Sequence, residues 1–184
     1  MLPLANITWL HVEPTTKCNA HCPACARNNN GYGLFKDLVL ESLSPVRFLE
    51  VLNQLPSLKT VQMCGTFGDP ISSEYIKELV DICVERQLAV RIHTNGSVKT
   101  VSWWQELANK LKSVDHAVVF GIDGLEDTNH LYRRRSNWSS IMRAVDLAVQ
   151  SAAHVRWDTN IFEFNYRNKK HVLAMARNVI AVVA

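Results

Sequence analysis

Short runs of β-branched and aliphatic residues alternate with longer amphipathic stretches along the whole chain of 184 residues. This alternation is typical of repeated βα units, in which helices connect parallel strands and cover the sheet. The sequence therefore predicts an α/β fold. Each expected strand is apolar enough to be covered on both faces, and the strands span residues 7–13, 58–64, 88–94, 116–122 and 155–162.

Helix signals follow these strands. Ser44 as an N-cap and Pro45 at the first helical position predict a helix that stops near Pro56. Apolar residues at helical spacing predict further helices over residues 76–84, 102–112 and 137–150, and from about residue 169 onward. Cys83 lies within one of these apolar stripes, so we expect it to be a buried small hydrophobic residue.

Five βα units in series are too few for a closed eight-stranded barrel, for which roughly 250 residues are typical. The sequence favours a partial (β/α) barrel of parallel strands with about five to six βα units, in one domain over residues 1–184. Ligands of barrels and of open α/β sheets bind at the carboxyl ends of the strands. The loops that follow the strands are therefore the expected place for chemistry.

Charge and hydropathy exclude several classes of partner. The net charge of +3 is small and its residues are scattered, so there is no clear nucleic-acid signal. No apolar run approaches the roughly 20 residues that a membrane-spanning helix needs, and the N-terminus lacks the features of a signal peptide. We therefore expect a cytoplasmic protein with no membrane partner. In a reducing compartment, five cysteines favour metal binding or catalysis over a disulfide framework.

Three cysteines lie in one loop after the first expected strand: Cys18, Cys22 and Cys25. Three close thiols could belong to a zinc site, to an iron–sulfur cluster, or to a redox pair with a spare thiol. Zinc is the weaker choice, because a structural zinc site usually has four protein ligands and no second CxxC or His pair follows. Cys64 could supply a fourth thiolate, whereas three thiolates alone would leave one iron open for a reactant.

The other strand ends carry polar, glycine-rich segments. Each of them alone is compatible with an ordinary turn. Together they predict a pocket for a polar small molecule beside a metal centre, since glycine permits close backbone approach and Asp, Asn and Thr offer hydrogen bonds. The segments are CGTFGDP at 64–70, HTNGS at 93–97, GIDG at 121–124 and DTN at 158–160.

The cysteine loop CNAHCPACAR resembles the cluster loop of the radical S-adenosylmethionine (radical SAM) superfamily, whose motif is CxxxCxxC, and most closely that of members with SPASM or Twitch extensions. The resemblance covers nearly the whole chain. It implies that Cys18, Cys22 and Cys25 hold a [4Fe–4S] cluster whose fourth iron is chelated by S-adenosyl-L-methionine. It also implies reductive cleavage to a 5′-deoxyadenosyl radical, and an electron donor such as a flavodoxin or ferredoxin.

The same resemblance implies contacts to S-adenosylmethionine at the other strand ends. GTFGDP is similar to the family's Gly-Gly-Glu segment, with an aspartate in the acidic place, and HTNGS is similar to its third-strand segment. The segment after the fourth strand, which contains Asp123 and Arg133, is also similar to the family. In the fifth strand, Asn160 resembles an asparagine that can reach the ribose. The implied cofactor-binding residues are Gly68, Asp69, Thr94, Asn95, Asp123, Arg133 and Asn160.

The chain also departs from the family pattern. Ala24 stands where many relatives have an aromatic residue near the adenine, and Gly121 stands where serine is common. The default interpretation of the run Arg133–Arg135 is a solvated loop. No cysteine follows Cys83, so we expect no C-terminal auxiliary-cluster domain in this chain. Either the enzyme is minimal or truncated, or another polypeptide completes the substrate side.

Two functions remain open at this point. The first is a radical SAM enzyme that abstracts hydrogen, with a peptide or protein as the favoured substrate class by analogy with similar relatives. The second is a non-catalytic iron–sulfur electron-transfer protein or a structural zinc-binding protein. Only the first requires the regions of Asp69 and Asn160 to bind a nucleoside.

Overall fold

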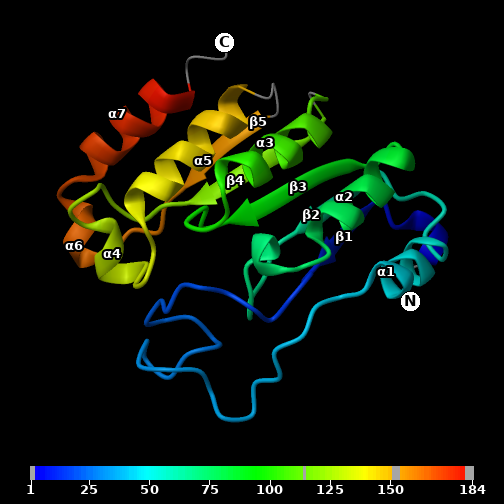
Figure 1. Cartoon of the computed structure of the whole chain (residues 1–184), viewed down its shortest axis with the longest axis horizontal. Coiled ribbons are helices and arrows are strands. Elements are labelled where there is room, and N and C mark those ends of the chain that lie inside the picture. The colour runs from blue at the N-terminus through cyan, green and yellow to red at the C-terminus, as the bar shows by residue number, and fades with distance from the viewer. Residues whose placement is uncertain (1–2, 114, 151–153, 181–184) are drawn as a thin grey trace.

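The computed structural model describes residues 3–113, 115–150 and 154–180. Five parallel strands within these ranges form one sheet (Figure 1). The strand order β1-β2-β3-β4-β5 follows the chain, so successive crossovers turn the same way and place the helices on one face. The predicted α/β fold is confirmed. The strands are β1 (Trp9–Val12), β2 (Thr60–Met63), β3 (Ala89–Thr94), β4 (Ala117–Gly121) and β5 (His154–Asp158).

Helices follow every strand, as predicted. In α1, Pro45 occupies the first position, and the Ser44 side chain accepts a hydrogen bond from the Arg47 amide at 3.3 Å. None of the described helices is long and apolar enough to cross a membrane. The helices are α1 (Pro45–Leu52), α2 (Ile76–Glu85), α3 (Val101–Lys110), α4 (Asn129–Tyr132), α5 (Trp138–Gln150), α6 (Glu163–Tyr166) and α7 (Lys169–Ile180), with short 3-10 turns η1 (Leu4–Asn6) and η2 (Pro70–Ser72).

The hydrophobic core lies between the sheet and its helices. Met63 of β2, Ile92 of β3 and Phe120 of β4 point into it and are 0% exposed. Cys83 of α2 is also 0% exposed and belongs to the same cluster, which confirms its predicted place in the core.

We expect Cys83→Ala to lower the free energy of unfolding by about 1 kcal/mol, because the change leaves a small void in a tightly packed cluster. Urea unfolding of the variant and the parent measures this difference. Iron content after reconstitution should stay at the parent level, since Cys83 lies in the core and not on the cysteine loop. A large loss of iron would show that this thiol is a ligand.

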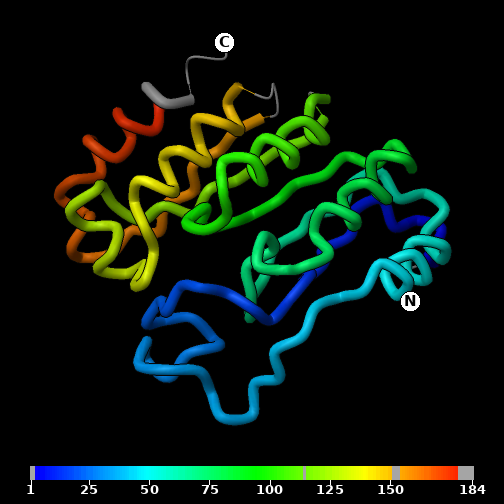
Figure 2. The backbone as a smooth tube through the Cα atoms, in the orientation of Figure 1, coloured from blue at the N-terminus to red at the C-terminus, as the bar shows by residue number. Residues whose placement is uncertain are grey.

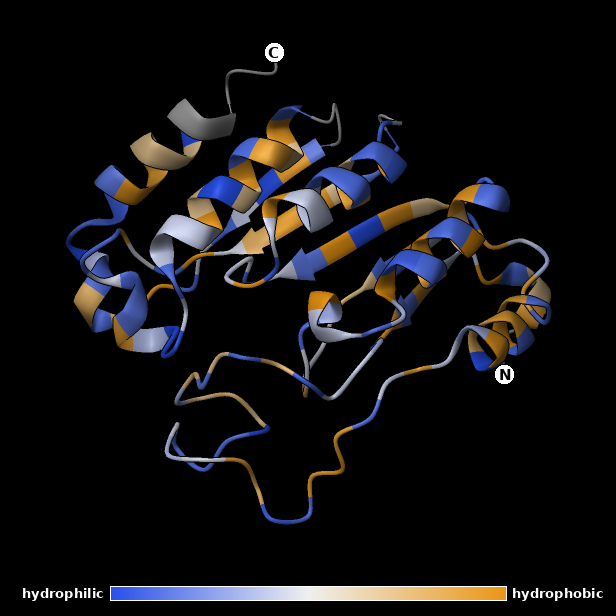
Figure 3. Cartoon of the chain, viewed as in Figure 1, coloured by the Kyte–Doolittle hydropathy of each residue, from blue (hydrophilic) through white to orange (hydrophobic). Residues whose placement is uncertain are grey.

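The opposite, concave face of the sheet is more polar. His11, Gln62 and Arg91 are register partners across β1, β2 and β3, and Figure 3 shows hydrophilic and hydrophobic residues alternating along β3. In the edge strands β1 and β5, the residues on this face are exposed. The expectation that each strand is covered on both faces is therefore wrong, because five strands leave a barrel open and its concave face lacks an opposite wall.

The connection between β1 and α1 carries the three-cysteine loop. It spans residues 13–44 and extends past the carboxyl ends of the strands, as the blue-to-cyan tube in Figure 2 shows. Two isolated antiparallel bridges join distant parts of this segment, one between Thr15 and Ser42 and one between Asn28 and Leu34. The cysteines therefore lie at the edge of the sheet where ligands are expected.

The fifth strand is shorter than predicted. It ends at Asp158, because the chain then turns toward the end of β4. There Thr159 Oγ1 donates to the Ile122 carbonyl at 2.8 Å, and the Asn160 amide donates to Asp123 Oδ1 at 2.7 Å. Asn160 thus lies in a loop after the strand and not within it.

Candidate functional site

A cavity of about 660 Å³ opens at the carboxyl ends of β2 to β5. It is lined by residues from each of the four polar segments predicted at the strand ends, so four regions far apart in the sequence form one site. Of the seven predicted cofactor-binding residues, the lining includes Gly68, Asp69, Thr94, Asn95, Arg133 and Asn160. The remaining lining residues are Cys64, Gly65, His93, Val119, Gly121, Trp157, Asp158 and Thr159.

Asp69 joins the rim after β2 to the end of β3. It is 5% exposed, and its carboxylate accepts hydrogen bonds from Thr94 Oγ1 at 2.7 Å, the Asn95 amide at 2.7 Å and the Ile71 amide at 3.2 Å. Burial raises the pKa of Asp69, while these hydrogen bonds oppose the rise. Besides facing the cavity, Asp69 thus fixes the neighbouring strand end.

Gly68 allows the same rim to approach the segment that leads into the cysteine loop. A Cβ at this position would lie 1.8 Å from the Thr15 carbonyl oxygen. The next amide, that of Asp69, donates to the Lys17 carbonyl at 2.8 Å. Only glycine permits this close backbone contact, so Gly68 sets the distance between the rim and the cysteine loop.

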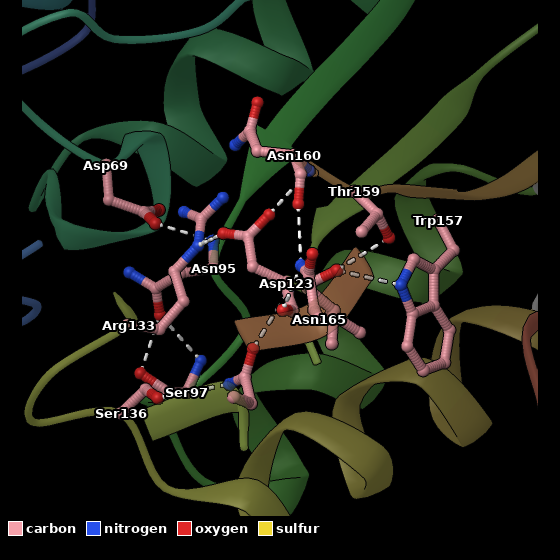
Figure 4. A network of polar contacts seen from close by, with 12 residues as sticks. Asp69, Asn95, Ser97, Asp123, Arg133, Ser136, Trp157, Thr159, Asn160 and Asn165 are labelled. Atoms are coloured by element: carbon pink, nitrogen blue, oxygen red, sulfur yellow. Dashed lines mark hydrogen bonds and ion pairs between the residues drawn. The ribbon is translucent and has the colours of Figure 1, made fainter. Parts of the chain in front are cut away.

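Asp123 does not line the cavity, although it was predicted to bind the cofactor. It is 0% exposed, accepts from Arg133 Nε at 2.5 Å and from the Asn160 amide at 2.7 Å, and so holds two lining residues in place (Figure 4). Asn165, a residue that the sequence did not single out, donates from Nδ2 to the carbonyls of Asp123 and Asn160 at 2.7 and 2.8 Å. These contacts make Asp123 the centre of a polar network below the cavity.

Arg133 is not a solvated loop residue, contrary to the default interpretation of the arginine run. Arg133 has only 19% of its side chain exposed because it pairs with Asp123. A Cβ at Gly121 would lie 2.6 Å from Arg133 Nη2, so glycine at this position makes room for the guanidinium. A larger side chain at this position would displace it.

The next two arginines contact the cysteine loop. The Arg134 carbonyl accepts from the His21 amide at 2.9 Å, and Arg135 Nη1 lies 3.2 Å from His21 Nε2. Arg134 also lies over the Tyr32 ring, with its guanidinium carbon 5.8 Å from the ring centroid. The segment after β4 therefore supports the cysteine loop and the cavity wall together.

Two of the three predicted ligand cysteines contact the residues around the cavity. Asn95, which lines it, directs Nδ2 toward Cys18 Sγ at 3.6 Å, and Cys25 Sγ lies 3.7 Å from the carbonyl of Thr66 in the rim after β2. Burial raises the pKa of Cys18 to about 12 and also raises that of Cys22. Both thiols hold their protons at neutral pH until a metal displaces them.

A [4Fe–4S] cluster and a single metal ion place different demands on the three thiols. Within the described ranges, no three His, Cys, Asp or Glu side chains are grouped to hold one metal ion. A [4Fe–4S] cluster does not need such a group, because each thiolate binds a different iron. A buried cation also lies beside the loop: Arg27 is 2% exposed, and its Nε has no hydrogen-bond partner. Such a cation suits an anionic thiolate-bound cluster.

A family model described as the radical SAM superfamily matches residues 12–177. The chain belongs to the radical SAM superfamily. The cofactors of this family are a [4Fe–4S] cluster and S-adenosylmethionine, and the cysteine loop and the adjoining cavity fit both. No curated protein matches the chain.

Solved radical SAM structures share the fold. SuiB of Streptococcus suis bound to precursor peptide SuiA has a TM-score of 0.75 and 16% identity over 95% of this chain and 38% of SuiB. The enzyme anSMEcpe with bound AdoMet has a TM-score of 0.68 and 17% identity over 93% and 46% of the two chains. TYW1 with a lysine-pyruvate adduct gives 0.59 and 14% over 84% and 56%. The chain thus spans between 38% and 56% of the length of these three proteins.

Proposed function

We propose that this chain is the catalytic domain of a radical SAM enzyme that reductively cleaves S-adenosylmethionine and uses the resulting radical to abstract hydrogen from a substrate. The observation that carries this proposal is the position of the Cys18, Cys22 and Cys25 loop, which adjoins a cavity lined by residues from four strand ends. A protein that used the thiols only for structure or electron transfer would not need that cavity.

The residues around the cavity have different roles in this proposal. The three cysteines hold the cluster, and Asn95 links Cys18 to the lining. When bound, the cluster supplies the electron that cleaves the sulfonium bond and yields a 5′-deoxyadenosyl radical. Arg133 offers the guanidinium nitrogens that are not bonded to Asp123, and these suit a carboxylate or a ribose hydroxyl.

The far wall of the cavity faces the substrate side in this proposal. It includes the apolar side chains of Val119 and Trp157, and His93. Burial lowers the pKa of His93, as do the neighbouring cations, although Asp158 opposes them, so the imidazole is neutral at neutral pH. Neutral and apolar side chains protect a radical from quenching better than ionised ones would, although Asp158 and Arg133 also line this cavity.

Peptide or protein modification is the substrate class that we favour. Among the solved structures with this fold, SuiB is bound to a precursor peptide and anSMEcpe to a Cp18Cys peptide. The concave face of the sheet, with exposed positions on both edge strands, leaves room for an extended polar chain. The one-electron donor in this proposal is a flavodoxin or ferredoxin, and the compartment is the reducing cytoplasm.

Anaerobic reconstitution with iron and sulfide tests the proposal. We expect about four irons and four sulfides per chain, a cluster that dithionite reduces, and 5′-deoxyadenosine as a product from S-adenosylmethionine. A cluster that is reduced without cleaving S-adenosylmethionine would favour an electron-transfer protein. Stoichiometric zinc with no iron would favour a structural metal site, and either result would overturn the proposal.

Asn160 offers a sharp test of the cofactor site. Its backbone is held by Asp123 and Asn165, whereas its side-chain amide makes none of the hydrogen bonds found among the described residues. We expect Asn160→Ala to weaken S-adenosylmethionine binding by about 1–3 kcal/mol, or roughly 5- to 150-fold. Stability should change by less than about 0.5 kcal/mol.

Calorimetric titration of the reconstituted protein with S-adenosylmethionine measures the affinity, and iron content serves as the control. Asp69→Ala is the informative comparison, because it should weaken binding and also destabilise the end of β3, where Asp69 accepts from Thr94 and Asn95. If Asn160→Ala binds and cleaves the cofactor like the parent, the ribose assignment is wrong.

A further inference from the structure

Arg27 belongs to the cysteine loop and follows the last cysteine of the motif by two residues. Its side chain folds back, and Nη1 donates to the Cys18 carbonyl at 2.8 Å. The residue is only 2% exposed, so its guanidinium is removed from bulk water. Arginine is always protonated in proteins, and a positive charge is therefore buried within the loop.

This charge has no carboxylate partner among the described residues. None of the ion pairs found there includes Arg27, and its buried Nε makes no hydrogen bond. Arg133, the other largely buried arginine of the site, pairs with the fully buried Asp123. A buried ion without a counterion costs several kcal/mol. The position of Arg27 thus calls for an anion that the polypeptide does not itself supply as a carboxylate.

The cysteine loop can supply that anion, because Arg27 already contacts it through the Cys18 carbonyl. Arg27 follows Cys25 by two residues and holds the backbone of Cys18, so its guanidinium lies within the segment that carries the three thiols. When iron displaces the thiol protons, three thiolates and the cluster carry a net negative charge. One added electron would make that charge more negative by one unit.

We propose that Arg27 is the built-in countercharge of the cluster: its buried guanidinium favours both the assembly of the cluster on the thiolates and its one-electron reduction. The electron comes from an external one-electron donor and stays on the cluster, while Arg27 neither gains nor loses a proton. Arg27 thus acts on the cluster through its charge and is not a catalytic residue. The inference rests on the proposed function, since it requires that the cysteines bind an iron–sulfur cluster.

The experiment compares the midpoint potentials of reconstituted variants. Each protein is titrated with dithionite, and electron paramagnetic resonance measures the reduced cluster. In Arg27→Gln the charge is lost while a hydrogen-bond donor for the Cys18 carbonyl remains. We expect its midpoint to become more negative, so that at the parent's midpoint the ratio of reduced to oxidised cluster falls about tenfold, equal to about 59 mV for one electron. Arg27→Lys keeps the charge and should stay close to the parent.

Arg47→Gln is the matched control. It removes one arginine charge from the protein surface, where Arg47 pairs with Glu50 and keeps 75% of its side chain exposed. We expect its midpoint to equal that of the parent. A parent-like midpoint in Arg27→Gln would overturn the inference. So would an equal fall in Arg27→Lys and Arg27→Gln, because the effect would then come from hydrogen-bond geometry and not from charge.

Two further outcomes are also decisive. If Arg27→Gln binds too little iron for a titration, Arg27→Lys must restore both the iron content and the parent's midpoint; failure to do so overturns the inference. If the parent itself binds no iron–sulfur cluster, the proposed function fails together with the inference. A parent that binds the cluster and cleaves S-adenosylmethionine, with an unshifted Arg27→Gln, would contradict the role of Arg27 alone.

Discussion

Replacing Cys22 by alanine is expected to remove the [4Fe–4S] cluster, whereas Cys64→Ala is expected to retain it. Cys22 is 8% exposed in a loop whose backbone is fixed by the Cys25 amide, which donates to the Cys22 carbonyl at 3.1 Å, and by Asn28 Nδ2, which donates to the same carbonyl at 3.3 Å. A three-thiolate site that loses one ligand has no substitute held in place, so loss of iron should be almost complete.

Cys64 lies outside the cysteine loop. It lines the cavity at the end of β2, and its amide donates to the Val12 carbonyl at 3.0 Å. Ligation by Cys64 would occupy the iron that S-adenosylmethionine needs. Iron and sulfide analysis after anaerobic reconstitution, with the visible absorption of the cluster, measures both variants. An iron loss in Cys64→Ala as large as that in Cys22→Ala would show that Cys64 is a ligand.

Asp123→Ala is expected to lower the free energy of unfolding by about 3 kcal/mol and to weaken S-adenosylmethionine binding as well. The carboxylate is fully buried, balances Arg133 and holds the Asn160 amide. Its removal leaves a largely buried guanidinium without its partner and frees two residues of the cavity wall. The estimate lies at the lower end for a broken buried pair, because 19% of the Arg133 side chain reaches water.

A double-mutant cycle separates charge from hydrogen bonding. Asp123→Asn keeps an oxygen that can accept from the Asn160 amide but leaves Arg133 unpaired, and Arg133→Gln removes the cation. The double variant should be destabilised by less than the sum of the single changes, since each single change leaves one unpaired charge. Urea unfolding measures the four proteins. Additive losses would show that the pair contributes no coupling energy.

Much of the fold and part of the site could be predicted from the sequence. Hydrophobic periodicity identified all five strands, because burial under helices demands apolar residues at strand spacing. Cysteine spacing identified the loop, since ligands that share one cluster must be close along the chain. The prediction missed the early end of β5 and the open concave face. The first depends on contacts of Thr159 and Asn160 with β4, and the second on how far the sheet closes.

The polar side chains predicted at the strand ends lie there, and the structure shows contacts among them that the sequence did not indicate. Asp123 was predicted as a cofactor contact, yet it lies beneath the cavity and organises Arg133 and Asn160. Asn165 completes that network although it belongs to no recognised sequence motif. The structure alone distinguishes it, by its burial at 1% exposure. A sequence pattern shows that a polar residue follows a strand, but not which distant group its side chain meets.

The sequence by itself determined the order of βα units, the membership in the radical SAM superfamily and the three-thiol loop, because each depends on spacing between residues that are near one another in the chain. Only the tertiary structure decided that Gly121 makes room for Arg133, that Asp123 joins β4 to the loop after β5, and that Arg27 is buried without a carboxylate. The physical reason is that burial and the pairing of charges are set by how separate elements pack, and local spacing does not specify that packing.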